Sequence, residues 1–112
     1  MYDKKVVLVT GAGTGIGKAC ALRFLEGGYA AVIVGRRKEK IQEAASEFRE
    51  AFGEGAVLDL CADVSKREDV KAIFDAIEEK YGRLDVVINN AGVAPSHPFL
   101  ETPYEEYDRA VQ

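Results

Sequence analysis

Short apolar runs alternate with amphipathic segments along the chain, and this alternation constrains the fold more than any other feature of the sequence. Four runs are predicted to be buried strands, the last of them with a turn: Lys4–Thr10, Ala30–Gly35, Ala56–Val64 and Arg83–Gly92. The segments between them carry apolar residues at helical spacing. Apolar strands that alternate with helices are typical of a parallel sheet with helices on both faces. The sequence therefore predicts an α/β fold.

The predicted helices are defined by apolar faces and by residues that start or stop a helix. The first helix is expected to end at Gly27 and the second at Gly53, because glycine commonly follows the last helical residue. Ser65–Glu68 and Thr102–Glu105 match capping boxes, which predict the starts of a third and a fourth helix. The first three apolar faces are, in chain order, Ile16, Cys20, Phe24 and Leu25; Ile41, Ala44, Ala45, Phe48 and Phe52; and Val70, Ile73, Phe74, Ile77 and Tyr81.

The fourth predicted helix has a strong start, with Pro103 at the favoured first position, but no stop signal. Tyr104, Tyr107 and Val111 would form an apolar stripe on it that no other predicted element covers. We therefore expect residues 1–112 to be one domain, the N-terminal part of a longer, apparently truncated architecture. We also expect the chain to form a homo-oligomer.

The composition excludes several classes of function. The 112 residues are 47% hydrophobic and 30% charged, and the net charge of −4 argues against a nucleic-acid or anionic-membrane surface. No apolar run is long enough to span a membrane, and the N-terminus has no signal-peptide pattern. Cys20 and Cys61 lie in apolar segments without metal or redox spacing, so we expect reduced core thiols, no metal site and a cytoplasmic location.

The segment Val9–Ala19, VTGAGTGIGKA, is a glycine-rich turn between a predicted strand and a predicted helix. Such turns commonly bind phosphate at the helix N-terminus. An ATP-binding P-loop requires the pattern G-x-x-x-x-G-K-[ST]. Here Ala12 replaces its first glycine, and Ala19 has no hydroxyl group with which to bind magnesium. The segment therefore disfavours ATP as the ligand.

A dinucleotide loop fits these residues better. It needs a tight turn, a backbone that approaches pyrophosphate, and close helix packing, which Gly11, Gly15 and Gly17 can supply. The spacing G-x-x-x-G-x-G differs from G-x-G-x-x-G, so a turn without a ligand stays an alternative. Arg36 and Arg37 follow the second strand where an NAD-binding protein would place an acid, and they suit a 2′-phosphate. The alternative is that the two arginines are solvated basic residues before the second helix, without a ligand.

Four segments together closely resemble the classical short-chain dehydrogenases/reductases, and the likeness covers essentially the whole chain. They are TGAGTGIG at Thr10–Gly17, ADV at Ala62–Val64, NNAG at Asn89–Gly92 and PFLETPYEEYDRAV at Pro98–Val111. The resemblance implies a Rossmann-type fold that binds a nicotinamide cofactor, with about four parallel strands in the order 3-2-1-4. Arg36 and Arg37 favour NADP as the nicotinamide cofactor, with NAD also possible.

The resemblance also implies roles for individual residues of this sequence. Gly11, Thr14, Gly15, Ile16 and Gly17 would surround the pyrophosphate. The residues implied at the adenine are Asp63 and Val64, and those at the ribose on the nicotinamide side are Asn90, Ala91 and Gly92.

The chain departs from the family in its chemistry. Family members use an Asn, a Ser and a Tyr-x-x-x-Lys pair for proton transfer to the substrate. No tyrosine of this sequence has a lysine four residues later. The family's asparagine would be expected just past Gln112, and His97 is expected to be a loop residue. The sequence thus predicts the cofactor-binding part of an oxidoreductase that transfers hydride to or from a carbonyl or alcohol substrate, with no catalytic residue of its own. The alternative is a non-catalytic dinucleotide-binding or interaction module.

Overall fold

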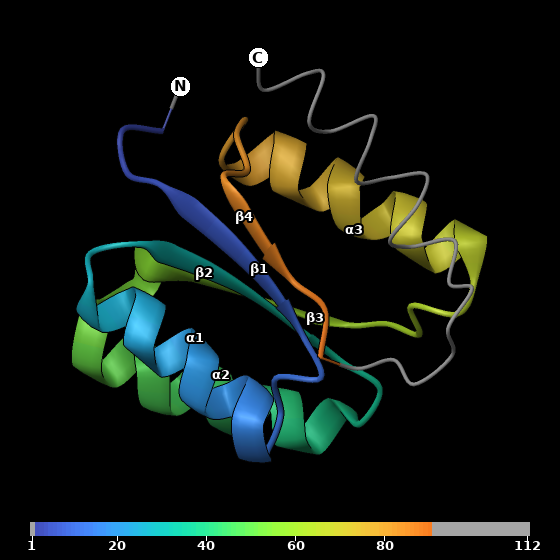
Figure 1. Ribbon diagram of the computed structural model, residues 1–112, viewed down its shortest axis with the longest axis horizontal. Coiled ribbons are helices and arrows are strands. Elements are labelled where there is room, and N and C mark those ends of the chain that lie inside the picture. The colour runs from blue at the N-terminus through green and yellow to red at the C-terminus, as the bar shows by residue number, and fades with distance from the viewer. Residues whose placement is uncertain (1, 91–112) are drawn as a thin grey trace.

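The computed structural model describes residues 2–90, in which strands and helices alternate (Figure 1). The elements are β1 Val6–Thr10, α1 Gly15–Glu26, β2 Ala30–Gly35, α2 Lys38–Phe52, β3 Val57–Cys61, α3 Arg67–Lys80 and β4 Val86–Ile88, with a 3-10 turn, Glu54–Ala56, before β3. The predicted fourth helix at Thr102–Glu105, together with Ala91, Gly92 and His97, lies outside the described residues.

The four strands form one parallel sheet in the order β3-β2-β1-β4, which confirms the predicted α/β fold and strand order. Val9 of β1 lies between Ile33 of β2 and Ile88 of β4. The chain winds from β1 through β2 to β3 and then returns to the other side of β1. A parallel sheet opens a crevice at the carboxyl ends of its strands where the winding reverses, which is here between β1 and β4.

Helices cover both faces of the sheet (Figure 1): α3 lies on one face, and α1 and α2 lie on the other. Successive residues of a strand point to opposite faces. In β1, Val6 and Leu8 therefore join the cluster under α3, while Val7 and Val9 join the cluster under α1 and α2. All five residues of β1 are buried, as expected for the central strand of a covered sheet.

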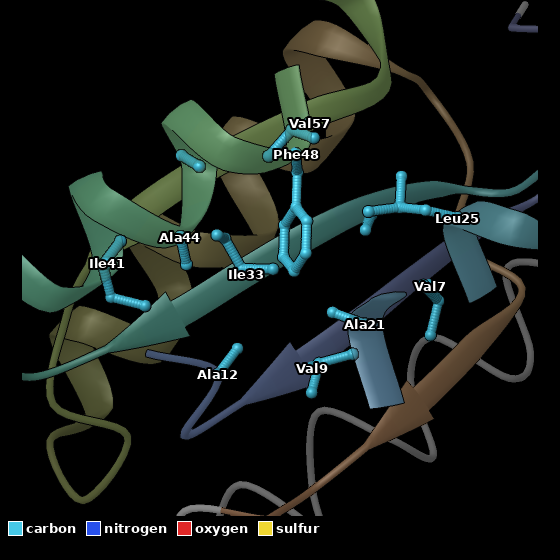
Figure 2. Packing of buried hydrophobic residues seen from close by; sticks show 12 residues of the cluster. Val7, Val9, Ala12, Ala21, Leu25, Ile33, Ile41, Ala44, Phe48 and Val57 are labelled. Carbon is cyan, nitrogen blue, oxygen red and sulfur yellow. The ribbon is translucent and has the colours of Figure 1, made fainter. Parts of the chain in front are cut away.

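Figure 2 shows the apolar cluster between the sheet and the pair α1 and α2. Phe48 of α2 and Leu25 of α1 both point toward the sheet, where Ile33 lies beneath α2. The α2 face is the one predicted from periodicity, with Ile41 and Ala44 buried one turn apart. This packing fixes the N-terminal ends of both helices beside the carboxyl ends of β1 and β2.

The predicted apolar face of α1 is partly wrong. Ile16 is 73% exposed, and the buried residues of the helix are Gly17, Ala21 and Leu25. Small residues at two of these positions let the helix approach the strands closely, and this approach turns Ile16 outward. The prediction of two core thiols is also wrong, because Cys61 is exposed.

The predicted capping box at Ser65–Glu68 does not form, and α3 begins at Arg67. The Ser65 hydroxyl donates to Asp63 Oδ1 at 2.6 Å, so it is engaged outside the helix. Asp69, in the first turn, instead accepts a hydrogen bond from the Asp63 N–H at 2.8 Å. The start of α3 is thus tied to the segment that follows β3.

No helix within residues 2–90 is long and apolar enough to cross a membrane. Nor do these residues contain a group of three His, Cys, Asp or Glu side chains that could hold a metal ion.

Candidate functional site

The loops after β1 and β3 are joined to the end of β2 by backbone hydrogen bonds at the carboxyl edge of the sheet. The N–H of Ala12, after β1, donates to the Val34 carbonyl of β2 at 3.1 Å. The N–H of Ala62, after β3, donates to the Gly35 carbonyl at 2.9 Å. These bonds extend the strand pairing into the loops, so the loops are held at fixed positions relative to one another.

The glycine loop between β1 and α1 has a backbone that other residues would adopt at a cost. Gly11 and Gly15 have φ angles of 63° and 62°, in the left-handed region that favours glycine. A β-carbon on Gly17 would lie 2.1 Å from the Gly11 carbonyl oxygen and 2.8 Å from Nδ2 of Asn90. The first turn of α1 therefore packs against the loop at a distance that only glycine allows.

The N-terminus of α1 suits an anion. Thr14 is the N-cap residue, but its side chain makes no capping hydrogen bond, and the first turn of the helix contains no acidic residue. The first N–H groups of a helix have no partner within the helix, and the helix dipole gives this end a partial positive charge. A phosphate group can accept hydrogen bonds from such N–H groups.

Thr10 joins the ends of β1 and β4. Its side chain is completely buried, and its hydroxyl donates to Asn89 Oδ1 at 2.8 Å. The same hydroxyl oxygen accepts a hydrogen bond from the Asn90 N–H at 2.9 Å, and Asn90 Nδ2 donates to the Gly11 carbonyl at 3.4 Å. Asn90 is thereby held over the glycine loop, at the point where the winding of the sheet reverses.

An open cavity of about 310 Å³ lies at this edge of the sheet. Its walls come from the glycine loop, the end of β2, the first turns of α2, the segment after β3, and Asn90 after β4. The lining residues are Gly11, Gly13, Thr14, Val34, Gly35, Arg36, Arg37, Lys40, Ile41, Ala62, Val64 and Asn90. The cavity thus joins an apolar part, a basic part and a glycine-rich part in one space.

The basic part consists of Arg36, Arg37 and Lys40. Within residues 2–90, none of these three side chains forms an ion pair. Arginine presents a planar set of donors that matches a phosphate, and lysine presents a compact charge. The basic part is therefore suited to a phosphate group at the mouth of the cavity.

Asp63 lies beside the cavity but does not line it. Its carboxylate accepts hydrogen bonds from the hydroxyl group and the backbone N–H of Ser65, and these bonds hold the pKa of the Asp63 side chain below its ordinary value. Arg36 lowers this pKa further through its charge. Asp63 therefore shapes the turn that presents Ala62 and Val64 to the cavity.

The structure brings six of the predicted site residues together in the cavity wall: Gly11, Thr14, Arg36, Arg37, Val64 and Asn90. Four others flank the wall without lining it: Gly15, Ile16, Gly17 and Asp63. Ala91 and Gly92 lie outside the described residues. The assignment of all these residues to a cofactor stays a prediction.

Several residues of the site were not predicted: Lys40, Gly13 and Ala62 in the cavity wall, and Thr10 beneath it. Lys40 belongs to the basic sequence GRRKEK, and this cluster of positive charge could have indicated that Lys40 lines the cavity. Gly13 and Ala62 lie within the recognised segments, but nothing in their residue type pointed to the cavity wall. The role of Thr10 depends on contacts with residues 79 and 80 positions later in the chain, which no local pattern reveals.

Comparison with known proteins identifies the family. Residues 5–112 match the sequence profile described as short chain dehydrogenase. The chain therefore belongs to the short chain dehydrogenase family, as its motifs predicted, and its parallel sheet is the Rossmann-type arrangement expected of that family.

Three relatives illustrate the match. The 3beta-hydroxysteroid dehydrogenase of Mediterraneibacter gnavus is 43% identical over 100 residues, which are 89% of this chain and 36% of that protein. The crystal structure of a short chain dehydrogenase from Bacillus anthracis gives a TM-score of 0.72 at 42% identity, covering 79% of this chain and 35% of that chain. The crystal structure of the L-sorbose reductase from Gluconobacter frateurii, complexed with NADPH and L-sorbose, gives a TM-score of 0.75 at 34% identity. The match covers 92% of this chain and 39% of that chain. This chain spans less than half the length of each.

Proposed function

We propose that residues 1–112 are the cofactor-binding part of an NADP(H)-dependent oxidoreductase. The observation that carries the proposal is the cavity at the carboxyl ends of the strands, where the glycine loop faces Arg36 and Arg37. NAD(H) is the weaker of the two cofactors in this proposal. The reaction transfers a hydride between the nicotinamide ring and a carbonyl or alcohol carbon of a small substrate.

The pyrophosphate binds at the glycine loop and the N-terminus of α1. The residues that surround it in the proposal are Gly11, Thr14, Gly15, Ile16 and Gly17. The backbone N–H groups of the first helical turn are its donors. The absence of a β-carbon on Gly17 fits this role, since the loop and the helix can then approach the same phosphate. Side chains at this point would fill the space between them.

The adenosine end lies over β2 and β3. Val34, Ala62 and Val64 give that part of the cavity its apolar walls, which suit an adenine ring, and Asp63 fixes the turn that carries the last two. Arg36 and Arg37 contact the 2′-phosphate of NADP(H) by charge-assisted hydrogen bonds. The NADPH bound by the similar L-sorbose reductase supports this choice of cofactor.

The nicotinamide end lies near β4, where Asn90, Ala91 and Gly92 line the ribose in the proposal. When bound, the cofactor supplies the hydride, and the protein supplies position and electrostatics. A positioned proton donor for the substrate oxygen is also needed. Because the sequence contains no Tyr-x-x-x-Lys pair, we expect the 112-residue chain by itself to turn over no substrate. A cytoplasmic location and a homo-oligomeric state are part of the same proposal.

Binding of the two cofactors tests the proposal. NADPH and NADH are titrated into the protein by fluorescence or calorimetry, in the parent and in Arg36→Ala and Arg37→Ala. We expect NADPH to bind at least about tenfold more tightly, since one charge-assisted hydrogen bond contributes about that factor. Each arginine variant should reduce the difference between the affinities for NADPH and NADH.

Arg23→Ala is the matched control, because this arginine has a side chain that is 83% exposed and lies on α1 away from the cavity wall. It should leave both affinities unchanged. Equal affinity for NADPH and NADH in the parent would refute the preference for NADP(H). Failure to bind either cofactor would support the alternative of an interaction module.

A further inference from the structure

Lys40 differs from the other basic residues at the end of β2. Arg36, Arg37 and Lys38 are exposed, whereas Lys40 is half-buried and lines the cavity from the first turn of α2. Lys38 carries the same charge two residues earlier but does not line the cavity. Lys40 therefore contributes its side chain to the wall of the space that the two arginines also line.

The charge at this helix end is unfavourable for the protein alone. Residues 36–40 contain four cationic side chains and one carboxylate, Glu39. A helix N-terminus carries a partial positive charge, so lysines in the first turn of α2 are disfavoured by the helix dipole. Lys40 forms no ion pair within residues 2–90 that would offset this effect. An anionic ligand would relieve it.

The glycine loop leaves room for the Lys40 side chain. The loop from Gly11 to Gly17 contains no cationic residue, so the loop itself offers only backbone N–H groups to a ligand. A β-carbon on Gly13 would lie 3.1 Å from the β-carbon of Lys40 and 3.7 Å from Cδ1 of Ile41. Glycine at position 13 thus allows α2 and its lysine to lie directly beside the loop.

We propose that Lys40, in the first turn of α2, is a specificity-determining residue that binds the 2′-phosphate of NADP(H) together with Arg36 and Arg37. This inference rests on the proposed function. A phosphate monoester carries close to two negative charges at neutral pH and has three strong acceptor oxygens, so it can accept hydrogen bonds from a lysine as well as from the two arginines. The bound phosphate also offsets the positive charge at the start of α2. NADPH therefore stabilises this helix end, and NADH, which has a hydroxyl group there, does not.

The test compares Lys40→Met with Lys38→Met. Methionine keeps most of the aliphatic side chain and removes the charge, and Lys38 provides the same change outside the cavity wall. In Lys40→Met we expect the NADPH dissociation constant to rise about tenfold and the NADH constant to stay within about twofold. Lys38→Met should change both constants by less than about twofold, and Lys40→Arg should keep most of the preference for NADPH.

Thermal unfolding separates a binding role from a structural one. Removal of an unfavourable charge predicts that unliganded Lys40→Met melts at the parent temperature or slightly above it. A lower melting temperature together with weaker NADH binding would show that Lys40 is structural, and would overturn the inference. If the parent prefers NADPH and Lys40→Met keeps that preference, the inference fails and the proposed function stands. If the parent shows no preference for NADPH, the preference for NADP(H) in the proposed function fails, and this inference fails with it.

Discussion

Among single residues, Gly17 in the first turn of α1 and Gly27, the C-cap residue of this helix, differ in the space available for a β-carbon. A β-carbon on Gly17 would lie 2.1 Å from the Gly11 carbonyl oxygen, a distance that no neighbouring atom can relieve without moving the backbone. At the other end of the helix, a β-carbon on Gly27 would lie 3.5 Å from the Phe24 carbonyl oxygen, which is an ordinary contact. The same substitution should therefore have different effects at the two ends.

We predict that Gly17→Ala lowers the free energy of unfolding by about 1–3 kcal/mol, the usual cost of overpacking. It should also abolish cofactor binding, because the first turn of α1 must move away from the glycine loop. Gly27→Ala should change the free energy of unfolding by less than about 0.5 kcal/mol. Urea unfolding and NADPH titration of both variants check this. Equal effects at the two positions would contradict the packing described for Gly17.

At the scale of elements, Asp85 joins the start of β4 to the start of β1. Its Oδ2 accepts hydrogen bonds from the Val6 N–H at 2.8 Å and from Arg83 Nε at 3.0 Å, and its Oδ1 accepts one from Arg83 Nη2 at 2.8 Å. Burial raises the pKa of the Asp85 carboxyl, but these hydrogen bonds outweigh it and hold that pKa below its ordinary value of 3.8. The ionised form therefore stabilises the folded protein.

The sign of this effect predicts a pH dependence. Because the folded pKa of Asp85 is lowered, its contribution is fully present above the unfolded pKa and is lost as the pH falls through the folded pKa. We expect Asp85→Asn to lower the free energy of unfolding by about 1–2 kcal/mol near neutral pH. The difference from the parent should shrink below about pH 4. Denaturant unfolding of the parent and of Asp85→Asn at a series of pH values measures this difference in the free energy of unfolding.

Asp75→Asn is the control for Asp85→Asn. Asp75 pairs with Lys71 on α3 at 2.9 Å, but these side chains are 67% and 77% exposed. An exposed pair of this kind contributes less than about 1 kcal/mol, so Asp75→Asn should have a small effect at every pH. A loss as large as that of Asp85→Asn would mean that net charge, and not the link between β1 and β4, controls acid stability.

The elements were predicted well where the hydrophobic pattern decides the structure. β2 was predicted with its observed bounds, and the apolar faces of α2 and α3 follow their periodicity. The pattern failed for α1, because Gly17 and Ala21 bury a face that contains few large side chains. It also failed at Ser65, where a hydrogen bond to Asp63 replaces the cap.

The candidate site was predictable only in part, because local sequence patterns do not reveal contacts between distant elements. The glycine loop and the two arginines stand out in the sequence because their chemistry is unusual for their positions. Thr10 and Lys40 do not, since their positions in the site depend on packing between elements distant in the chain. Local patterns therefore predicted the parts of the cavity but not how the parts are held together.

At the scale of the whole molecule, β4 forms one edge of the sheet within residues 2–90. Val86, Val87 and Ile88 are only partly buried there, and such an apolar edge is a template for pairing with another chain. We predict that the 112-residue chain self-associates, with a mass that rises with concentration in sedimentation or light scattering. The predicted helix at Thr102–Glu105, outside the described residues, is the second surface expected to take part. A cooperatively folding monomer at high concentration would contradict this.

We expect the cavity at the carboxyl ends of the strands to bind a dinucleotide, and nuclear magnetic resonance can follow this binding residue by residue. NADPH is added to the ¹⁵N-labelled protein, and the change in each backbone amide signal is followed. Signals of the glycine loop from Gly11 to Gly17, of Arg36 to Lys40, of Ala62 to Val64 and of Asn90 should change together, with one dissociation constant. Changes confined to other surfaces, or no change at saturating NADPH, would show that this cavity does not bind the cofactor.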